Sequence, residues 1–263
     1  MTTTVAVVGA TGKMGTLIGQ LIDESADFEV VASIGSKGSL NEMLVADCVV
    51  DVTVPAVSQD VVDFAVDHGL SVLVGTSGWT STRISSLERR VATKNTADGT
   101  SIGVIIIPNF SLGSVLATAF AAMAAKFFDS IEIVEAHSAS KVDSPSGTAT
   151  RTAELIGNAR ATLGPVEAPH TDQRARGQQV SSVPIHSLRM QGIVAKQDVI
   201  FGGTGEVLTL SHETIELTAY IAGIRLALAA LRDTEGVVVG LDKLIDLGSA
   251  DPSPQSPASI ETT

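Results

Sequence analysis

The chain contains 263 residues, of which 44% are hydrophobic and 17% charged, and it carries a formal net charge of −12. This length and composition are ordinary for a folded protein with one large core or two moderate ones, and they exclude disorder for most of the chain. The negative charge argues against nucleic acid and against an anionic membrane surface as partners, because both would repel the protein.

Several features indicate a cytoplasmic protein. Cys48 is the one cysteine, so no intramolecular disulfide can form, as is typical of a reducing compartment. The N-terminus begins with the polar stretch 1–4 and has no signal-peptide pattern. No apolar run approaches the roughly 18 residues that a membrane span requires. Residues 248–263 are rich in Ser and Pro, so we expect a disordered tail there.

The first part of the chain alternates between short apolar runs and helical spacing. A strand at Val5–Val8 ends at Gly9, and apolar residues then recur at helical spacing from Met14 to Ile22. Further strands are expected at Phe28–Ala32, Cys48–Val54, Ser71–Val74 and Gly103–Ile107, with helices at Val57–Asp67 and Ser81–Ala92. This alternation predicts an α/β domain over residues 1–108, with a doubly wound parallel sheet of Rossmann type that binds a dinucleotide.

The pattern changes after Pro108. A long helix is predicted over Leu112–Phe127, with one wide buried apolar face. Next come a strand at Ile131–Ala136, a helix at Ser146–Leu163, and strands at Val183–Met190, Asp198–Gly202 and Val207–Leu210. Consecutive strands predict a second α+β domain with a mixed sheet over residues 109–212, for substrate binding and oligomerisation. We expect residues 213–247, with a helix at Glu213–Arg232, to return to the first domain.

A glycine-rich segment lies between the first strand and the first helix. It reads Gly9-Ala10-Thr11-Gly12-Lys13-Met14-Gly15. Glycines at such a turn let a pyrophosphate approach the N-terminus of the helix, whose N–H groups and dipole favour anions. The alternative is a tight structural turn. Because a strand precedes the segment and a helix follows it, we expect this loop to bind a nucleotide.

The end of the second strand bears on the choice of cofactor. An acidic residue there accepts the ribose 2′-hydroxyl of NAD in many such domains, but residues 33–37 contain no carboxylate. Ser36 and Lys37, with Lys13 nearby, are suited to a 2′-phosphate instead. The alternative for Lys37 is an ordinary solvated loop residue. The sequence therefore favours NADPH, with NADH also possible.

The segment Glu135–Ala149 combines an imidazole, an ammonium group and a glycine at a helix start. His137 can give or take a proton near neutral pH, and Lys141 supplies a positive charge or a proton. The segment Ser146-Gly147-Thr148 presents backbone N–H groups to a carboxylate. A site that protonates and holds an anionic substrate is therefore predicted here. The other histidines, His68, His170, His186 and His212, are taken as structural by default.

This segment closely resembles the signature of bacterial dihydrodipicolinate reductases, Glu-x-His-His-x-x-Lys-x-Asp-x-Pro-Ser-Gly-Thr-Ala. The resemblance implies reduction of 4-hydroxy-tetrahydrodipicolinate by NAD(P)H in the diaminopimelate route to lysine. It also implies that His137 is the proton donor, that Lys141 assists it, and that Gly147 and Thr148 hold a substrate carboxylate. Ser138 occupies the position of the family's second histidine, a substrate contact.

The resemblance extends over residues 5–247 and includes two further loops. Residues Gly75-Thr76-Ser77 and Pro108-Asn109-Phe110 follow strands, and in the family these loops border the nicotinamide. A homotetramer that assembles through the second-domain sheets is implied as well, and no metal is expected. Two more positions depart from the family pattern, since Lys196 stands where a histidine is common and Leu217 where an arginine is common.

These departures leave two alternatives open. One is a paralogous reductase of a related cyclic imine or enamine, with a pocket altered at Ser138. The other is a nucleotide-binding regulator without turnover, which the presence of both His137 and Lys141 argues against.

Overall fold

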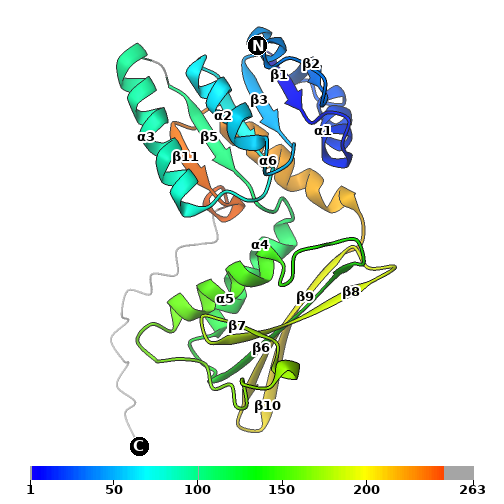
Figure 1. Ribbon diagram of the computed structural model, residues 1–263, viewed down its shortest axis with the longest axis vertical. Coiled ribbons are helices and arrows are strands. Elements are labelled where there is room, and N and C mark those ends of the chain that lie inside the picture. Colours follow the sequence, from blue (N-terminus) through cyan, green and yellow to red (C-terminus); the bar gives the residue numbers. More distant parts are fainter. Residues whose placement is uncertain (1, 100, 246–263) are drawn as a thin grey trace, which may run out of the picture.

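The computed structural model describes residues 2–99 and 101–245, so the tail expected at residues 248–263 lies outside the described residues. The chain builds two β-sheets that follow one another along the long axis of the molecule (Figure 1). Within the described residues, no helix is long and apolar enough to cross a membrane.

The first sheet has six parallel strands in the spatial order β11-β5-β4-β3-β1-β2. The strands are β1 (Thr3–Val8), β2 (Phe28–Ile34), β3 (Cys48–Asp51), β4 (Ser71–Val74), β5 (Gly103–Ile106) and β11 (Gly236–Val239). The strand order reverses between β1 and β3. A sheet of this kind binds ligands in the crevice beyond the carboxyl ends of its strands at that point.

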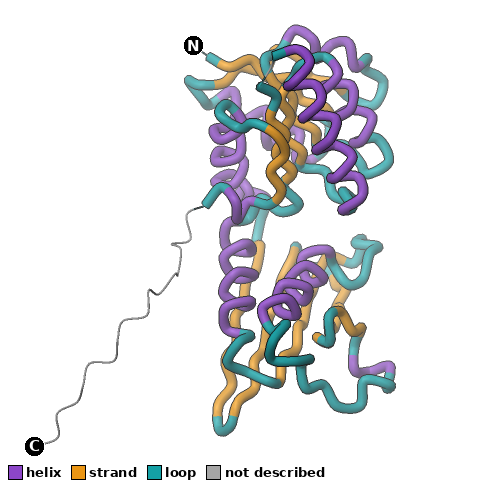
Figure 2. The backbone as a smooth tube through the Cα atoms, turned by 90° about the vertical axis from the view of Figure 1, so that its left-hand side faces the viewer, coloured by secondary structure: helices purple, strands orange, loops and turns teal. Residues whose placement is uncertain are grey.

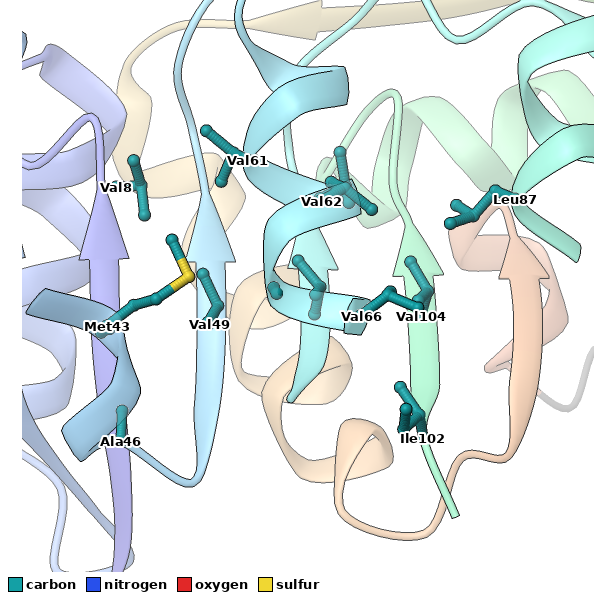
Figure 3. Packing of buried hydrophobic residues seen from close by; sticks show 14 of the residues in the cluster. Val8, Met43, Ala46, Val49, Val61, Val62, Val66, Leu87, Ile102 and Val104 are labelled. Carbon is teal, nitrogen blue, oxygen red and sulfur yellow. The ribbon is translucent and has the colours of Figure 1, made fainter. Parts of the chain in front are cut away.

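Helices cover both faces of this sheet, as Figure 2 shows for the upper half of the molecule. One face packs against α1 (Lys13–Asp23) and α6 (Ile221–Leu231), and the other against α2 (Ser58–Asp67) and α3 (Ser81–Asp98). In Figure 3, Val61, Val62 and Val66 of α2 lie over Val49 of β3 and Val104 of β5. Because both faces are covered, the central strands β3, β4 and β5 are buried at almost every position, whereas the edge strand β2 alternates between half-buried and exposed residues.

The second sheet is mixed, with five strands in the order β10-β9-β6-β8-β7. The strands are β6 (Ser130–Ser138), β7 (Gln178–Val180), β8 (Val183–Met190), β9 (Ala195–Gly203) and β10 (Glu206–Thr214). β6 runs parallel to β8, and every other pairing is antiparallel. Helices α4 (Leu112–Ala124) and α5 (Gly147–Ala159) pack on the sheet, with Ile131, Ile133 and Phe201 in the shared core.

The predicted fold class, a Rossmann-type sheet plus a mixed α+β sheet, is confirmed. The helix predicted over Glu213–Arg232 is wrong at its start. Strand β10 continues to Thr214, a 3₁₀ turn spans Leu217–Tyr220, and α6 begins only at Ile221. The register explains this, because Glu213 and Thr214 still pair with Lys196 and Ala195 of β9. Strand pairing therefore includes the residues at which the sequence pattern predicts the start of the helix.

The prediction of one wide buried face on α4 is also wrong. Phe120, Met123 and Phe127 of the predicted stripe are 49%, 55% and 82% exposed. The buried positions are small residues, Ser114, Ala121 and Ala125. Small side chains let α4 approach α5 and the sheet closely, which leaves the bulky residues on the outside.

Candidate functional site

The three glycines of the loop after β1 differ in what they do. Gly9 has φ +89°, and a Cβ there would lie 2.5 Å from the carbonyl oxygen of Val52. A Cβ on Gly15 would lie 2.3 Å from the carbonyl oxygen of Gly9. At Gly12, by contrast, the nearest atom is 3.3 Å away. Gly9 and Gly15 therefore shape the turn, whereas Gly12 leaves room for a ligand to approach.

The loop is suited to a pyrophosphate. Gly12 is the N-cap of α1, and no side chain among the described residues caps this helix. Its first N–H groups are thus available to an anion, which the helix dipole also attracts. The backbone N–H groups of Gly9 and Ala10 donate to the carbonyl of Ile34, at the end of β2. Ser36 and Lys37 follow directly, so their segment lies beside the loop.

A buried carboxylate holds the neighbouring loops together. Asp51, fully buried at the end of β3, accepts hydrogen bonds from the Thr53 hydroxyl at 2.6 Å and from the Ser58 hydroxyl. Ser58 in turn accepts a bond from Trp79 Nε1 at 3.0 Å. This chain of bonds fixes the loops after β3 and β4 relative to α2. The Thr76 hydroxyl, in the second of these loops, approaches the carbonyl of Asp51 at 3.5 Å.

A cavity of ≈ 400 Å³ lies between the two sheets. Residues of the first sheet and its loops form one side of it: Lys13, Met14, Gly75, Pro108, Asn109 and Phe110. Residues of the second sheet and α5 form the other: His137, Lys141, Ser146, Thr148, Lys196 and Gln197. The predicted nucleotide loop and the predicted acid–base residues are therefore brought to one space, although more than 100 residues separate them in the chain.

His137 is held by a buried carboxylate. Its Nδ1 lies 2.5 Å from Oε2 of Glu135, two residues earlier on β6, and the Glu135 side chain is fully buried. Burial by itself raises the pKa of Glu135, but hydrogen bonds from Arg189, Ser187 and His137 outweigh it and hold that pKa below its ordinary value. An ionised carboxylate only accepts hydrogen bonds, so Nδ1 carries a proton and Nε2 is the ring nitrogen left for a ligand.

Lys141 and Ser138 occupy the turn after β6. Lys141 lines the cavity and forms an ion pair with Asp143, its Nζ 2.8 Å from Oδ1. Burial tends to raise the pKa of Asp143, but the bond from Lys141 outweighs it and the pKa is lowered. Ser138 does not line the cavity. Its hydroxyl lies 3.0 Å from that of Ser140.

The start of α5 forms an anion cradle beside His137. Ser146 caps the helix by accepting a bond from the N–H of Ala149, and its own N–H donates to Glu135. The N–H groups of Gly147 and Thr148 remain for a ligand. Asn109 Nδ2, from the opposite wall, lies 3.4 Å from the Thr148 hydroxyl and connects the two sides of the cavity.

Several cavity residues lie outside the predicted set. These are Ser114, Val194, Ala195, Gln197, His212, Thr214 and Tyr220, together with Lys196 and Leu217, which the sequence marked only as departures from the family pattern. Gln197 is 8% exposed and donates through Nε2 to the hydroxyl of Thr152, while its buried Oε1 has no partner among the described residues. An unpaired buried acceptor in a cavity wall suits a ligand that donates a hydrogen bond.

His212, taken as structural from sequence, also lines the cavity. Its Nε2 lies 3.1 Å from the hydroxyl of Ser111, and burial lowers its pKa, which favours a neutral ring. Only sequence-distant packing brings His212 and Gln197 to the site, so no local motif could have found them. The remaining predicted residues lie outside the cavity wall: Gly9, Ala10, Thr11, Gly12, Ser36, Lys37, Thr76, Ser77, Ser138 and Gly147.

Comparisons with known proteins identify the family to which the chain belongs. The family models for the N- and C-terminal parts of dihydrodipicolinate reductase match residues 3–110 and 113–245. The 4-hydroxy-tetrahydrodipicolinate reductase of Clavibacter michiganensis is 67% identical over 98% of this chain and 92% of that protein. The corresponding Streptomyces griseus protein is 41% identical over 92% of this chain and 98% of its own length.

A solved structure resembles the whole chain. The dipicolinate-bound dihydrodipicolinate reductase from Paenisporosarcina sp. TG-14 matches with a TM-score of 0.76 and 26% identity, over 93% of this chain and 100% of that one. Two family models that together cover nearly all described residues, a relative at 67% identity and a shared fold lead to one conclusion: the chain belongs to the dihydrodipicolinate reductase family.

Proposed function

We propose that this protein reduces 4-hydroxy-tetrahydrodipicolinate to tetrahydrodipicolinate with a reduced nicotinamide nucleotide, in the cytoplasmic route to diaminopimelate and lysine. The 4-hydroxyl group leaves as water, and the substrate gains a hydride and a proton. The observation that carries the proposal is the shared cavity. Lys13 and Met14 of the glycine loop face the same space as His137 and Lys141. Relatives named for this activity cover nearly the whole chain.

Each group of residues has a role that follows from its position in the site. When bound, the nicotinamide supplies the hydride. The uncapped N-terminus of α1 at Gly12 holds the pyrophosphate. The N–H groups of Gly147 and Thr148 hold one substrate carboxylate, and Lys141 offsets the charge that develops on the substrate. His137 Nε2 gives a proton to the atom that becomes electron-rich, and its Nδ1 stays bonded to Glu135.

The direct test is an assay of nucleotide oxidation with the substrate generated in place, beside a panel of other cyclic imines. A higher turnover on 4-hydroxy-tetrahydrodipicolinate than on any other imine supports the proposal. The paralogue alternative predicts the reverse order, and the regulator alternative predicts nucleotide binding without turnover. If position 138 reaches the substrate, Ser138→His should raise kcat/KM on this substrate more than on the others.

We further propose a preference for NADPH. The end of β2 offers Ser36 and Lys37 beside the glycine loop, and no acidic residue stands at positions 33–37. Lys37→Ala should weaken NADPH binding by about tenfold, which corresponds to about 1.4 kcal/mol, and should weaken NADH binding less. Fluorescence titration with both nucleotides measures this. Equal losses for both would mean that Lys37 does not contact the 2′-phosphate.

A further inference from the structure

Glu135 is a buried carboxylate with an unusual number of donors. Arg189 binds it with two parallel bonds, Nη1 to Oε2 at 2.9 Å and Nη2 to Oε1 at 2.8 Å. The backbone N–H of Ser146 donates to Oε1 at 3.2 Å, and His137 Nδ1 lies 2.5 Å from Oε2. One side chain thus contacts the predicted acid, the first residue of the anion cradle and an arginine on the neighbouring strand.

Strand register explains why these groups meet. β6 and β8 run parallel, with His137 opposite Arg189 and Glu135 opposite Ser187. Glu135 and His137 are two residues apart, so they lie on the same face of β6. Arg189 also donates from Nη2 to the carbonyl of Asp143 at 2.6 Å, in the turn that carries Lys141. The arginine therefore connects β6 to that turn.

We infer that Glu135 and Arg189 are positioning residues for proton transfer, an inference that rests on the proposed role of His137. Glu135 holds the His137 ring with the proton on Nδ1, so that Nε2 faces the cavity and carries the transferable proton. Its charge stabilises the imidazolium before transfer. After transfer, His137 is a neutral imidazole that keeps its Nδ1 proton on Glu135, and the proton from Nε2 is on the product.

Arg189 has a complementary part. A bare buried carboxylate would stabilise the imidazolium too strongly and hinder release of its proton. The bidentate guanidinium offsets that charge and fixes the plane of the carboxylate, which in turn fixes the plane of the imidazole. Through Asp143, the same arginine also keeps the Lys141 turn against the cavity.

The chain contains a matched group that serves as a control. On the same strand, Glu132 accepts a bond from His186 Nε2 at 2.5 Å and pairs with Arg176. The chemistry is the same, a glutamate between a histidine and an arginine. None of these three side chains lines the ≈ 400 Å³ cavity. Glu132 is 27% exposed and lies on the other face of β6, so its substitution removes a paired carboxylate away from the cavity.

The first experiment needs no substitution. With histidines labelled with ¹⁵N, the NMR spectrum of the whole protein above pH 8 should show neutral His137 as the Nδ1–H tautomer. His137→Gln assigns the signal by its disappearance. A predominant Nε2–H tautomer would overturn the inference whether or not the protein reduces the proposed substrate.

The second experiment compares pH profiles of kcat/KM for Glu135→Gln and Glu132→Gln. Without the negative charge beside the imidazolium, the alkaline limb of the Glu135→Gln profile should move to lower pH. The kcat should fall by up to about 10²-fold, with nucleotide affinity unchanged. Other charged groups of the site, Lys13, Lys141, Asp143, Lys196 and His212, remain in place in both variants. The Glu132→Gln variant should have the same alkaline limb in its pH profile and the same kcat as the wild type.

A third variant separates charge from geometry. Arg189→Lys keeps the positive charge but loses the bidentate pairing, so kcat should fall several-fold while the alkaline limb stays in place. Identical pH profiles for Glu135→Gln and Glu132→Gln would overturn the inference. If the wild-type protein reduces none of the imines, the proposed function fails, and the tautomer measurement still decides whether Glu135 orients the ring.

Discussion

His137 and Lys141 differ in how firmly the chain holds them. The side chains of His137 and Glu135 are 17% and 0% exposed, whereas those of Lys141 and Asp143 are 28% and 58% exposed. An ion pair as accessible as the second contributes little to stability, about 1 kcal/mol or less. Lys141 can thus exchange Asp143 for a substrate carboxylate at small cost, while His137 is fixed before substrate arrives.

Removing the side chain of His137 or of Lys141 should lower the rate of the chemical step and leave cofactor binding unchanged. His137→Ala and Lys141→Ala should each lower kcat by roughly 10²–10⁴, as expected when a positioned acid or charge is lost. Steady-state kinetics measures the loss, and a nucleotide titration checks the binding. Asp143→Ala is the control, because it removes only the resting partner of Lys141 and should change kcat little. Weaker nucleotide binding in the His137 variant would contradict a role for His137 in the chemical step alone.

Two paired glutamates, Glu135 and Glu132, also make stability depend on pH. The pKa of Glu135 and that of Glu132 both lie below the ordinary 4.5, since the opposing effect of burial is outweighed by hydrogen bonds from Arg189 and Arg176. The unfolded chain therefore binds more protons than the folded one just below pH 4.5. The stabilisation is fully present above that pH and is lost as the pH falls through the folded-state values.

Unfolding measured by denaturant at pH 6 and at pH 3.5 should show this loss. The double variant Glu132→Gln, Glu135→Gln should be less stable than wild type at pH 6. The difference should be smaller at pH 3.5, because the unfolded wild-type chain binds protons there that the folded state does not. A difference that is the same at both pH values would contradict the assignment of these two groups.

At the level of elements, different glycines of the loop after β1 determine the shape of the turn and the access of a ligand to α1. Gly12→Val should abolish nucleotide binding, because the added side chain fills the approach to the N-terminus of α1. The melting temperature should stay close to that of the wild type, because the nearest atom to the new Cβ is the carbonyl oxygen of Gly9, 3.3 Å away. Gly15→Val should instead lower the melting temperature, since its Cβ would lie 2.3 Å from the same carbonyl oxygen. Calorimetry of melting and of nucleotide binding distinguishes the two effects.

Elements with a strong period could be predicted, and weakly patterned ones could not. The alternation of strands and helices up to β5 was readable because each segment is long enough to show one period. The sequence pattern does not predict β7 (Gln178–Val180), which has three residues, two of them Gln. It does not predict β11 (Gly236–Val239) either, although β11 has as many residues as β3, β4 and β5. Pairing with β8 and β5 makes these segments strands, and pairing is not a local property.

The same contrast holds for the site. His137, Lys141 and Thr148 stand within one segment, and their shared chemistry could be read from it. Arg189 and His212 reach the site through strand register and packing against α4, 52 and 75 residues after His137 by position number. A sequence pattern without contacts has no means of placing such residues. This is why the orienting arginine was missed.

For the whole molecule, α4 and α5 pack on one side of the second sheet, and the other side carries exposed apolar side chains. Along β8, Val183 and Ile185 are buried beneath α5, whereas Leu188 and Met190 are 45% and 49% exposed. On β10, Val207 is 69% exposed. An apolar sheet face of this kind is typical of an interface between chains. We propose that it is the face through which four copies assemble, as the family resemblance implies.

Light scattering at micromolar concentration should then give a mass four times the chain's 27.0 kDa. The double variant Leu188→Asp, Val207→Asp should reduce that mass, because unpaired carboxylates would be buried in the interface. Phe127→Asp is the matched control. Phe127 is 82% exposed but follows α4, in the helical layer of the molecule, and its substitution should leave the mass unchanged. A monomeric wild type would contradict the assembly, and dissociation by Phe127→Asp alone would move the interface to the helices.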